Sequence, residues 1–148
     1  MQDLKAPTDS DDGSADGTAL MRHYEKWIEL GKMRGYPFCT EPPNYKRYME
    51  EVGFVDVREE IKIWPNGPWM EDEKMKTLGL WTRANQLNVW DGFQRAGKFP
   101  PGTTKEQLDA EIEAVKKDLV DPNIHSYMKL WENLPFLWNH NKLILAGT

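Results

Sequence analysis

A chain of 148 residues has the length of one domain with a sizeable core. Its 19 Lys and Arg residues against 24 Asp and Glu residues give a net charge of -5, which argues against nucleic-acid binding because that relies on clustered basic side chains. Cys39 is the only cysteine, so the sequence excludes an internal disulfide and a thiolate metal site within one chain.

No apolar run approaches the roughly 20 residues that a membrane helix needs. The acidic N-terminus also lacks the basic and apolar regions of a secretory signal. We therefore expect a cytoplasmic or nuclear protein without a membrane partner.

Residues 1–17 are rich in Asp, Ser and Gly and contain few large apolar side chains. Such a composition does not offset the entropy of ordering the chain. We therefore predict a mobile acidic leader over 1–17 and a single domain over 18–148.

Two helices are predicted in the first third of this domain. Apolar residues from Leu20 to Ile28 follow a helical period, with Thr18 as the N-cap and Gly35 as the stop. The second helix begins at Pro42 and Pro43, where a missing N–H costs nothing, and ends before Gly53.

One strand is predicted with a half-buried face, because apolar and charged residues alternate from Val55 to Ile63 before Pro65 ends the run. A lone strand has unpaired edges on both sides. Its partner is expected to be either the C-terminal segment or another chain.

The rest of the chain is mainly helical by pattern. Two short helices are predicted within 71–96, with Gly79 and Gly92 as weak points. A further helix follows a capping box of Thr103 and Glu106 and ends at Asp121-Pro122, whereas residues 124–148 have no clean period and suit strand, helix or both. The predicted fold class is mainly α with one or two β-strands.

Several motifs together resemble a known family. They are Gln2-Asp3, SDDGS at 10–14, RGYPF at 34–38, YKRYMEEVGFVDVREE at 45–60, IKIWPNGPWMEDEKMKTLG at 61–79 and DLVDPNIHSY at 118–127. This order resembles the C-terminal half of the LaeA-like enzymes, fungal class I S-adenosylmethionine-dependent methyltransferases of secondary metabolism. The resemblance implies a truncated α/β fold that begins near the end of the fifth strand of a seven-stranded sheet, and that needs self-association or a partner to complete the sheet.

The cofactor half is missing in this interpretation. Cofactor sites on doubly wound sheets use a Gly-rich turn, but no two glycines of this chain stand two positions apart, so no GxG motif exists. We expect no cofactor site on this chain alone, and S-adenosylmethionine only where a partner supplies the site.

Candidate site residues come from the same resemblance. Trp64, Trp69, Trp81 and Trp90 follow the strand where the related enzymes cover the acceptor, and aromatic walls suit a small aromatic or polyketide-like molecule. The same residues also suit a core that caps the strand. His125 lies in an I-H-x-Y stretch and suits either a structural hydrogen bond or a catalytic base.

Other polar groups are given ordinary roles. The acidic pair Asp11-Asp12 is interpreted as solvated surface, and His23 as a surface or packing residue. His140 receives no role, and no metal site is predicted because no second ligand stands at a suitable spacing.

Three functions remain open at this point. The chain is a methyltransferase-family subunit that needs another chain, for example a full-length relative; a non-catalytic assembly or binding module, for example a homodimer; or a cofactor-independent cyclase or isomerase. A gene model whose true start lies upstream is equally compatible with the sequence. The resemblance implies a reaction class but no substrate.

Overall fold

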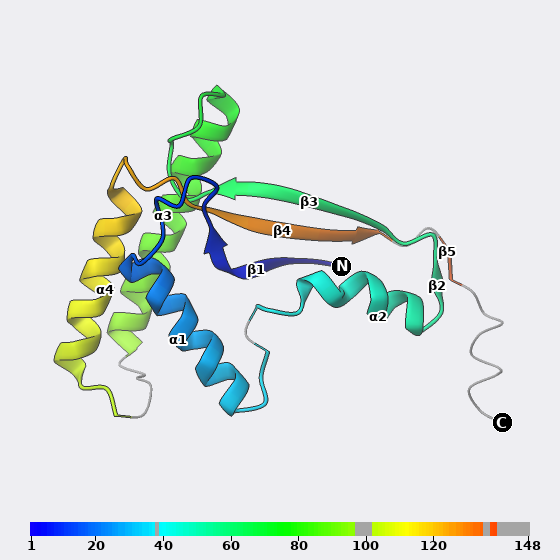
Figure 1. The fold of residues 1–148 in the computed structure, drawn as a ribbon, viewed down its shortest axis with the longest axis horizontal. Helices are drawn as coiled ribbons and strands as arrows, with labels where there is room; N and C mark the ends of the chain where they lie inside the picture. Colours follow the sequence, from blue (N-terminus) through cyan, green and yellow to red (C-terminus); the bar gives the residue numbers. More distant parts are fainter. Residues whose placement is uncertain (38, 97–101, 135–136, 139–148) are drawn as a thin grey trace.

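The computed structural model describes residues 1–37, 39–96, 102–134 and 137–138. The helices are α1 (Ala19–Met33), a short 3₁₀ helix η1 (Pro42–Asn44), α2 (Tyr45–Glu51), α3 (Glu73–Ala96) and α4 (Lys105–Val120). The strands are β1 (Gln2–Asp9), β2 (Phe54–Val55), β3 (Arg58–Pro65), β4 (Tyr127–Leu134) and β5 (Leu137–Trp138). Figure 1 shows α1, α3 and α4 gathered at one end of a long narrow sheet.

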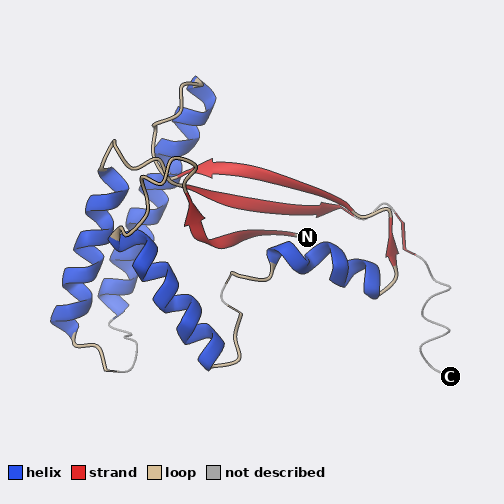
Figure 2. Cartoon of the chain, viewed as in Figure 1, coloured by secondary structure: helices blue, strands red, loops and turns tan. Residues whose placement is uncertain are grey.

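The main sheet has the strand order β1-β4-β3, and both pairs are antiparallel. The C-terminal segment therefore supplies the central strand β4, which confirms one of the two partners expected for the predicted strand. A second, two-stranded sheet pairs β2 with β5 (Figure 2). The described residues thus hold more strands than the one or two predicted, because β1 and β4 lack a clear alternating pattern.

The N-terminal segment corrects the prediction of a mobile leader. β1 pairs with β4 in the register Gln2↔Glu132 to Lys5↔Lys129, and Ala6, Thr8 and Ala15 are buried. Backbone pairing and small side chains hold the segment in place, although it has few large apolar residues. Residues 2–9 are therefore part of the sheet and not outside the core.

The core lies between α1, α3 and α4. Its buried residues are Ala19, Leu20, Trp90, Leu108, Ile112, Val115 and Leu119. The predicted apolar face of α4 is confirmed, but its capping box is formed by Thr104 and Gln107, one residue later than predicted. Thr18 caps α1 as predicted, and Gly35 follows its end with a φ of +69°.

Helix α3 is one continuous helix of 24 residues, so the prediction of two short helices is wrong. Gly79 does not break it. A Cβ built at Gly79 would lie 2.1 Å from the carbonyl oxygen of Gly67, so the glycine allows the loop after β3 to pass against the helix. A Cβ at Gly92 would meet nothing within 4 Å.

The predicted strand is present, but it is divided and largely exposed. Asp56, with a φ of +52°, separates β2 from β3. Residues 58–62 of β3 are all exposed, Ile63 and Trp64 are half-buried, and of this strand only Pro65 is buried. The apolar alternation therefore does not mark a fully covered face.

Candidate functional site

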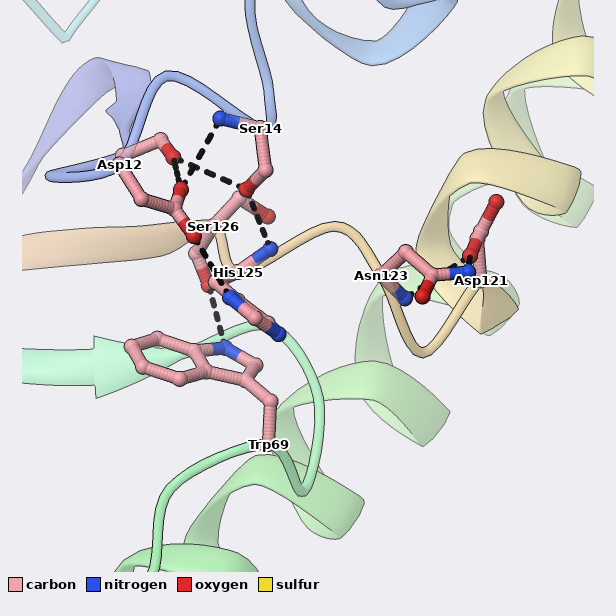
Figure 3. Close-up of polar contacts among 8 residues, drawn as sticks. Asp12, Ser14, Trp69, Asp121, Asn123, His125 and Ser126 are labelled. Atoms are coloured by element: carbon pink, nitrogen blue, oxygen red, sulfur yellow. Dashed lines mark hydrogen bonds and ion pairs between the residues drawn. The ribbon is translucent and has the colours of Figure 1, made fainter.

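The candidate site lies where β1 and β3 end and β4 begins. Both outer strands are antiparallel to β4 and therefore parallel to each other, so their carboxyl ends share one edge of the sheet. Ligand sites of open α/β sheets lie beyond such carboxyl ends. Residues 10–17, 66–69 and 121–126 meet at this edge (Figure 3).

Asp12 is held by several hydrogen bonds in this cluster. Its carboxylate accepts from the Ser10 hydroxyl at 2.8 Å and from the Ser14 backbone N–H at 2.9 Å. Hydrogen bonds from Ser14, Ser10 and His125 hold the pKa of the Asp12 carboxyl well below its ordinary value. Asp12 is therefore ionised at neutral pH. Its side chain is 49% exposed, so it lies at the surface as interpreted from the sequence, and the structure adds its hydrogen bonds to Ser10, Ser14 and His125.

His125 is oriented by this carboxylate. Its Nδ1 lies 2.7 Å from Asp12 Oδ2, and its backbone N–H donates to Ser14 Oγ at 2.8 Å. Because an ionised carboxylate only accepts hydrogen bonds, Nδ1 carries a proton, and in the neutral form of the ring Nε2 keeps a lone pair. Within the described part of the chain, no group hydrogen-bonds Nε2, and the side chain is 40% exposed.

Trp69 supports the other side of the imidazole. The ring centroids of Trp69 and His125 are 5.2 Å apart, with an interplanar angle of 32°. The indole Nε1–H donates to the carbonyl oxygen of Ser126 at 3.0 Å, which fixes the indole (Figure 3). The His125 ring is therefore held by a carboxylate and by an aromatic surface.

A buried polar network anchors the cluster to the core. Asn66 is 2% exposed, and its Nδ2 donates to Thr8 Oγ1 at 2.7 Å and to Ser126 Oγ at 2.9 Å. Its Oδ1 accepts from Gln86 Nε2 at 2.5 Å. This one side chain thus joins β1, α3 and the start of β4. The sequence analysis missed Asn66, for which the only signal was an Asn-Gly pair after the predicted strand.

Asp121 forms a tight turn beside the cluster. Its Oδ1 accepts from the backbone N–H of Asn123 at 2.9 Å and from its Nδ2 at 3.0 Å (Figure 3). A hollow of about 70 Å³ lies beside this turn and is lined by Trp69 and Arg83 among others. This volume holds a few water molecules but is too small for an organic acceptor.

The four tryptophans proposed as an acceptor pocket lie in different environments. Trp69 lies beside His125, whereas Trp90 is 4% exposed in the helical core. The Trp90 ring packs edge-on against His23, with the two ring centroids 4.8 Å apart. Trp81 is 73% exposed on α3, and Trp64 is paired with Met128 across the sheet. Of the four, only Trp69 lies in the His125 cluster.

The remaining histidines do not add to the site. His23 is 2% exposed; Trp27 Nε1 donates to its Nε2 at 2.7 Å, and Glu111 lies 3.4 Å from its Nδ1, so it is a packing residue, as predicted. His140 lies outside the described residues.

Within the described ranges, no three His, Cys, Asp or Glu side chains are grouped to hold a metal ion. No helix described here has the length and apolar character to cross a membrane.

Known proteins match most of this chain. The probable methyltransferase tdiE of Emericella nidulans is 32% identical over 133 residues, which cover 88% of this chain and 42% of tdiE. The secondary metabolism regulator laeA of Monascus pilosus is 31% identical, and the regulator LAE1 of Cochliobolus heterostrophus is 24% identical; each covers 79% of this chain.

The match covers only part of each relative. The chain spans 32% of the Monascus protein and 39% of the Cochliobolus protein. No family model matches the chain, and no solved structure matches it. Over most of its own length and part of theirs, this chain is therefore a homologue of the fungal LaeA-like methyltransferases and secondary-metabolism regulators.

Proposed function

We propose that this chain forms the acceptor side of a methyl-transfer site, and that another chain binds S-adenosylmethionine. The observation that carries the proposal is the placement of His125, oriented by Asp12 at 2.7 Å, at the carboxyl ends of β1 and β3. The methyltransferase name of tdiE supports the reaction class.

The His125 cluster has the chemistry of a general base. An acceptor hydroxyl or amine loses a proton when it is methylated, and a neutral imidazole takes that proton at Nε2. Asp12 holds the ring in the tautomer that leaves Nε2 free, and its charge stabilises the imidazolium that forms. Trp69 offers a flat surface on which an aromatic acceptor can lie beside the ring.

The residues of this chain do not fit a complete cofactor site. S-adenosylmethionine supplies the methyl group when it is bound, but sites for it on such sheets need a Gly-rich turn, and none is present in this sequence. The donors at the N-terminus of α1 are also in use: the Leu20 N–H donates to Asp118 Oδ2 at 2.9 Å, and the Met21 N–H donates to Thr18 Oγ1. This proposal therefore assigns no cofactor contact to these residues.

The outer edge of β1 offers a place for the partner. Met1 and Asn133 exchange backbone hydrogen bonds, so the alternation of an antiparallel pair turns the backbone groups of Gln2, Leu4 and Ala6 away from β4. Two of their N–H groups already have acceptors, Asp3 for Leu4 and Cys39 for Ala6. Among the described residues, the carbonyl groups of Gln2 and Leu4 and the Gln2 N–H make no backbone hydrogen bond, so they are the groups that a strand of the partner would use.

A calorimetric titration of S-adenosylmethionine tests the cofactor part of the proposal. Near-UV circular dichroism first establishes that the tryptophans of the purified chain are fixed in a folded core. We expect no saturable heat from the folded chain. Micromolar binding would overturn the proposed division between two chains.

A chemical modification tests the availability of His125. Diethyl pyrocarbonate reacts with an accessible neutral imidazole, so we expect rapid modification of His125 and slow modification of His23, which is 2% exposed. Peptide mapping by mass spectrometry separates the two sites. Protection of His125 equal to that of His23 would show that Nε2 is not available to an acceptor.

A further inference from the structure

A hollow of about 260 Å³ lies between β1, α1 and α3, away from the His125 cluster. Its apolar wall is formed by Leu4 and Ala6 of β1, Met128 of β4, Tyr24 of α1, and Trp90 and Phe93 of α3. We call this hollow the β1 cavity. Its volume is just below the roughly 300 Å³ at which pockets for drug-sized ligands begin, so it suits a molecule of one or two rings.

Three polar groups belong to the lining residues of the β1 cavity and lack partners. Tyr24 lines the cavity, and its hydroxyl makes no hydrogen bond among the described residues. Trp90 Nε1 and Gln86 Oε1 are buried without a hydrogen-bond partner in the described part of the chain, on residues that are 4% and 5% exposed.

Unpaired polar groups beside an apolar hollow call for a physical explanation. Leaving a buried donor or acceptor unpaired is unfavourable, and such groups are rare in folded proteins. Burial raises the pKa of Tyr24 to about 12, so its hydroxyl remains a neutral donor at physiological pH. A bound molecule with an oxygen acceptor would satisfy this donor and cover the apolar wall.

The other hollows of comparable size have a different character. The hollow of about 520 Å³ between α1 and α4 is lined by Arg22, Lys26 and Glu111 among others. Another hollow, of about 260 Å³, is lined by Lys26, Glu29 and Glu111 beside apolar residues. Such charged walls favour water. The β1 cavity, by contrast, is mostly apolar. Its lining includes Lys5, but the Lys5 ammonium lies 3.6 Å from the Asp9 carboxylate, so a charged ligand would lose its hydration there without a free opposite charge.

We infer that the β1 cavity is a binding site for a flat, uncharged molecule of one or two rings that carries a hydroxyl or carbonyl group. The rings pack between the sheet and α3, and the oxygen accepts a hydrogen bond from Tyr24. This inference does not depend on the proposed methyl transfer, because it concerns binding alone and Asp12, Trp69 and His125 do not line the cavity.

Calorimetric titrations with 2-naphthol and naphthalene test the inference on the whole chain. Val89 lines the β1 cavity and is 46% exposed, so Val89→Trp should fill its mouth. Leu80 lies on the same helix and is 45% exposed but does not line the cavity, which makes Leu80→Trp the matched control. We expect saturable binding of 2-naphthol, at least tenfold weaker in Val89→Trp and unchanged in Leu80→Trp.

The variant Tyr24→Phe tests the hydrogen bond. Loss of one neutral hydrogen bond should weaken 2-naphthol binding by about fivefold and leave naphthalene binding unchanged. Circular dichroism of each variant controls for folding. Absence of saturable binding to the folded wild type, equal binding by the two Trp variants, or equal effects of Tyr24→Phe on both ligands would each overturn the inference.

Discussion

The substitution Gly79→Ala should destabilise this protein, although the same change usually stabilises a helix. In an exposed helix interior, Ala is favoured over Gly by about 1 kcal/mol. At Gly79 the added Cβ would lie 2.1 Å from the oxygen and 2.6 Å from the carbon of the Gly67 carbonyl. These atoms belong to the backbone, so the Asn66–Trp69 loop would have to move as a unit.

Gly92→Ala is the matched control in the same helix, because its Cβ would meet nothing within 4 Å. Both variants gain the same helix propensity, so the difference between them is the cost of the overlap. Overpacking costs about 1–3 kcal/mol, and contact with a backbone carbonyl places this case at the upper end. In a chain of this size, each kcal/mol corresponds to a shift of about 2–4 °C in Tm.

Urea unfolding followed by tryptophan fluorescence measures both variants. We expect Gly92→Ala to be more stable than the wild type and Gly79→Ala to be less stable. The near-UV circular dichroism of Gly79→Ala should also change, because the displaced loop carries Trp69. Equal stabilities of the two variants would refute the close approach of α3 and the loop.

Two further predictions concern buried polar groups. Asn66→Ala removes three buried side-chain hydrogen bonds and should lower the free energy of unfolding, measured in urea, by about 3 kcal/mol. Asn88→Ala, at an exposed position of α3, should change this free energy little. Equal effects of the two substitutions would contradict the network. Burial lowers the pKa of His23 in the folded protein below its ordinary 6.5. Below pH 6.5 the unfolded state therefore binds more protons at His23 than the folded state does. The wild type should lose stability as the pH falls from 6.5 toward 5. His23→Gln should show a flatter pH dependence in this window, above the range where carboxyl groups titrate, and an unchanged slope would contradict this role of His23.

The helical part of the fold could be predicted from the sequence because its signals are local. The face of Leu108, Ile112, Val115 and Leu119 repeats at helical spacing, and all four residues are buried as predicted. β1 could not be predicted in this way, because its stability depends on pairing with residues about 130 positions away. Its sequence, QDLKAPTD, has neither alternation nor β-branched residues apart from one Thr.

The candidate site could be predicted only in part for the same reason. His125 was a candidate because it lies in a recognisable motif, but its partner Asp12 is 113 residues away in sequence. The Asp11-Asp12 pair has the composition of a solvated turn, and nothing local indicates that it faces a histidine. Trp69 was found by its residue type, whereas the packing of Trp90 into the helical core depends on contacts that no local pattern specifies.

The two edges of the main sheet differ in a way that bears on the proposed partner. Asn66 N–H donates to Ser126 O at 2.9 Å, so the alternation turns the backbone groups of Glu59, Ile61 and Ile63 away from β4. This outer edge of β3 is flanked by charged side chains and ends in a proline, two features that discourage pairing with another strand. The outer edge of β1 contains Pro7 and already receives Cys39 at Ala6. It carries three charged side chains against four in β3, however, and the carbonyl groups of Gln2 and Leu4 point away from β4. A partner strand is therefore expected to add at β1, which would place the partner next to the carboxyl end of β1 and the Asp12–His125 pair.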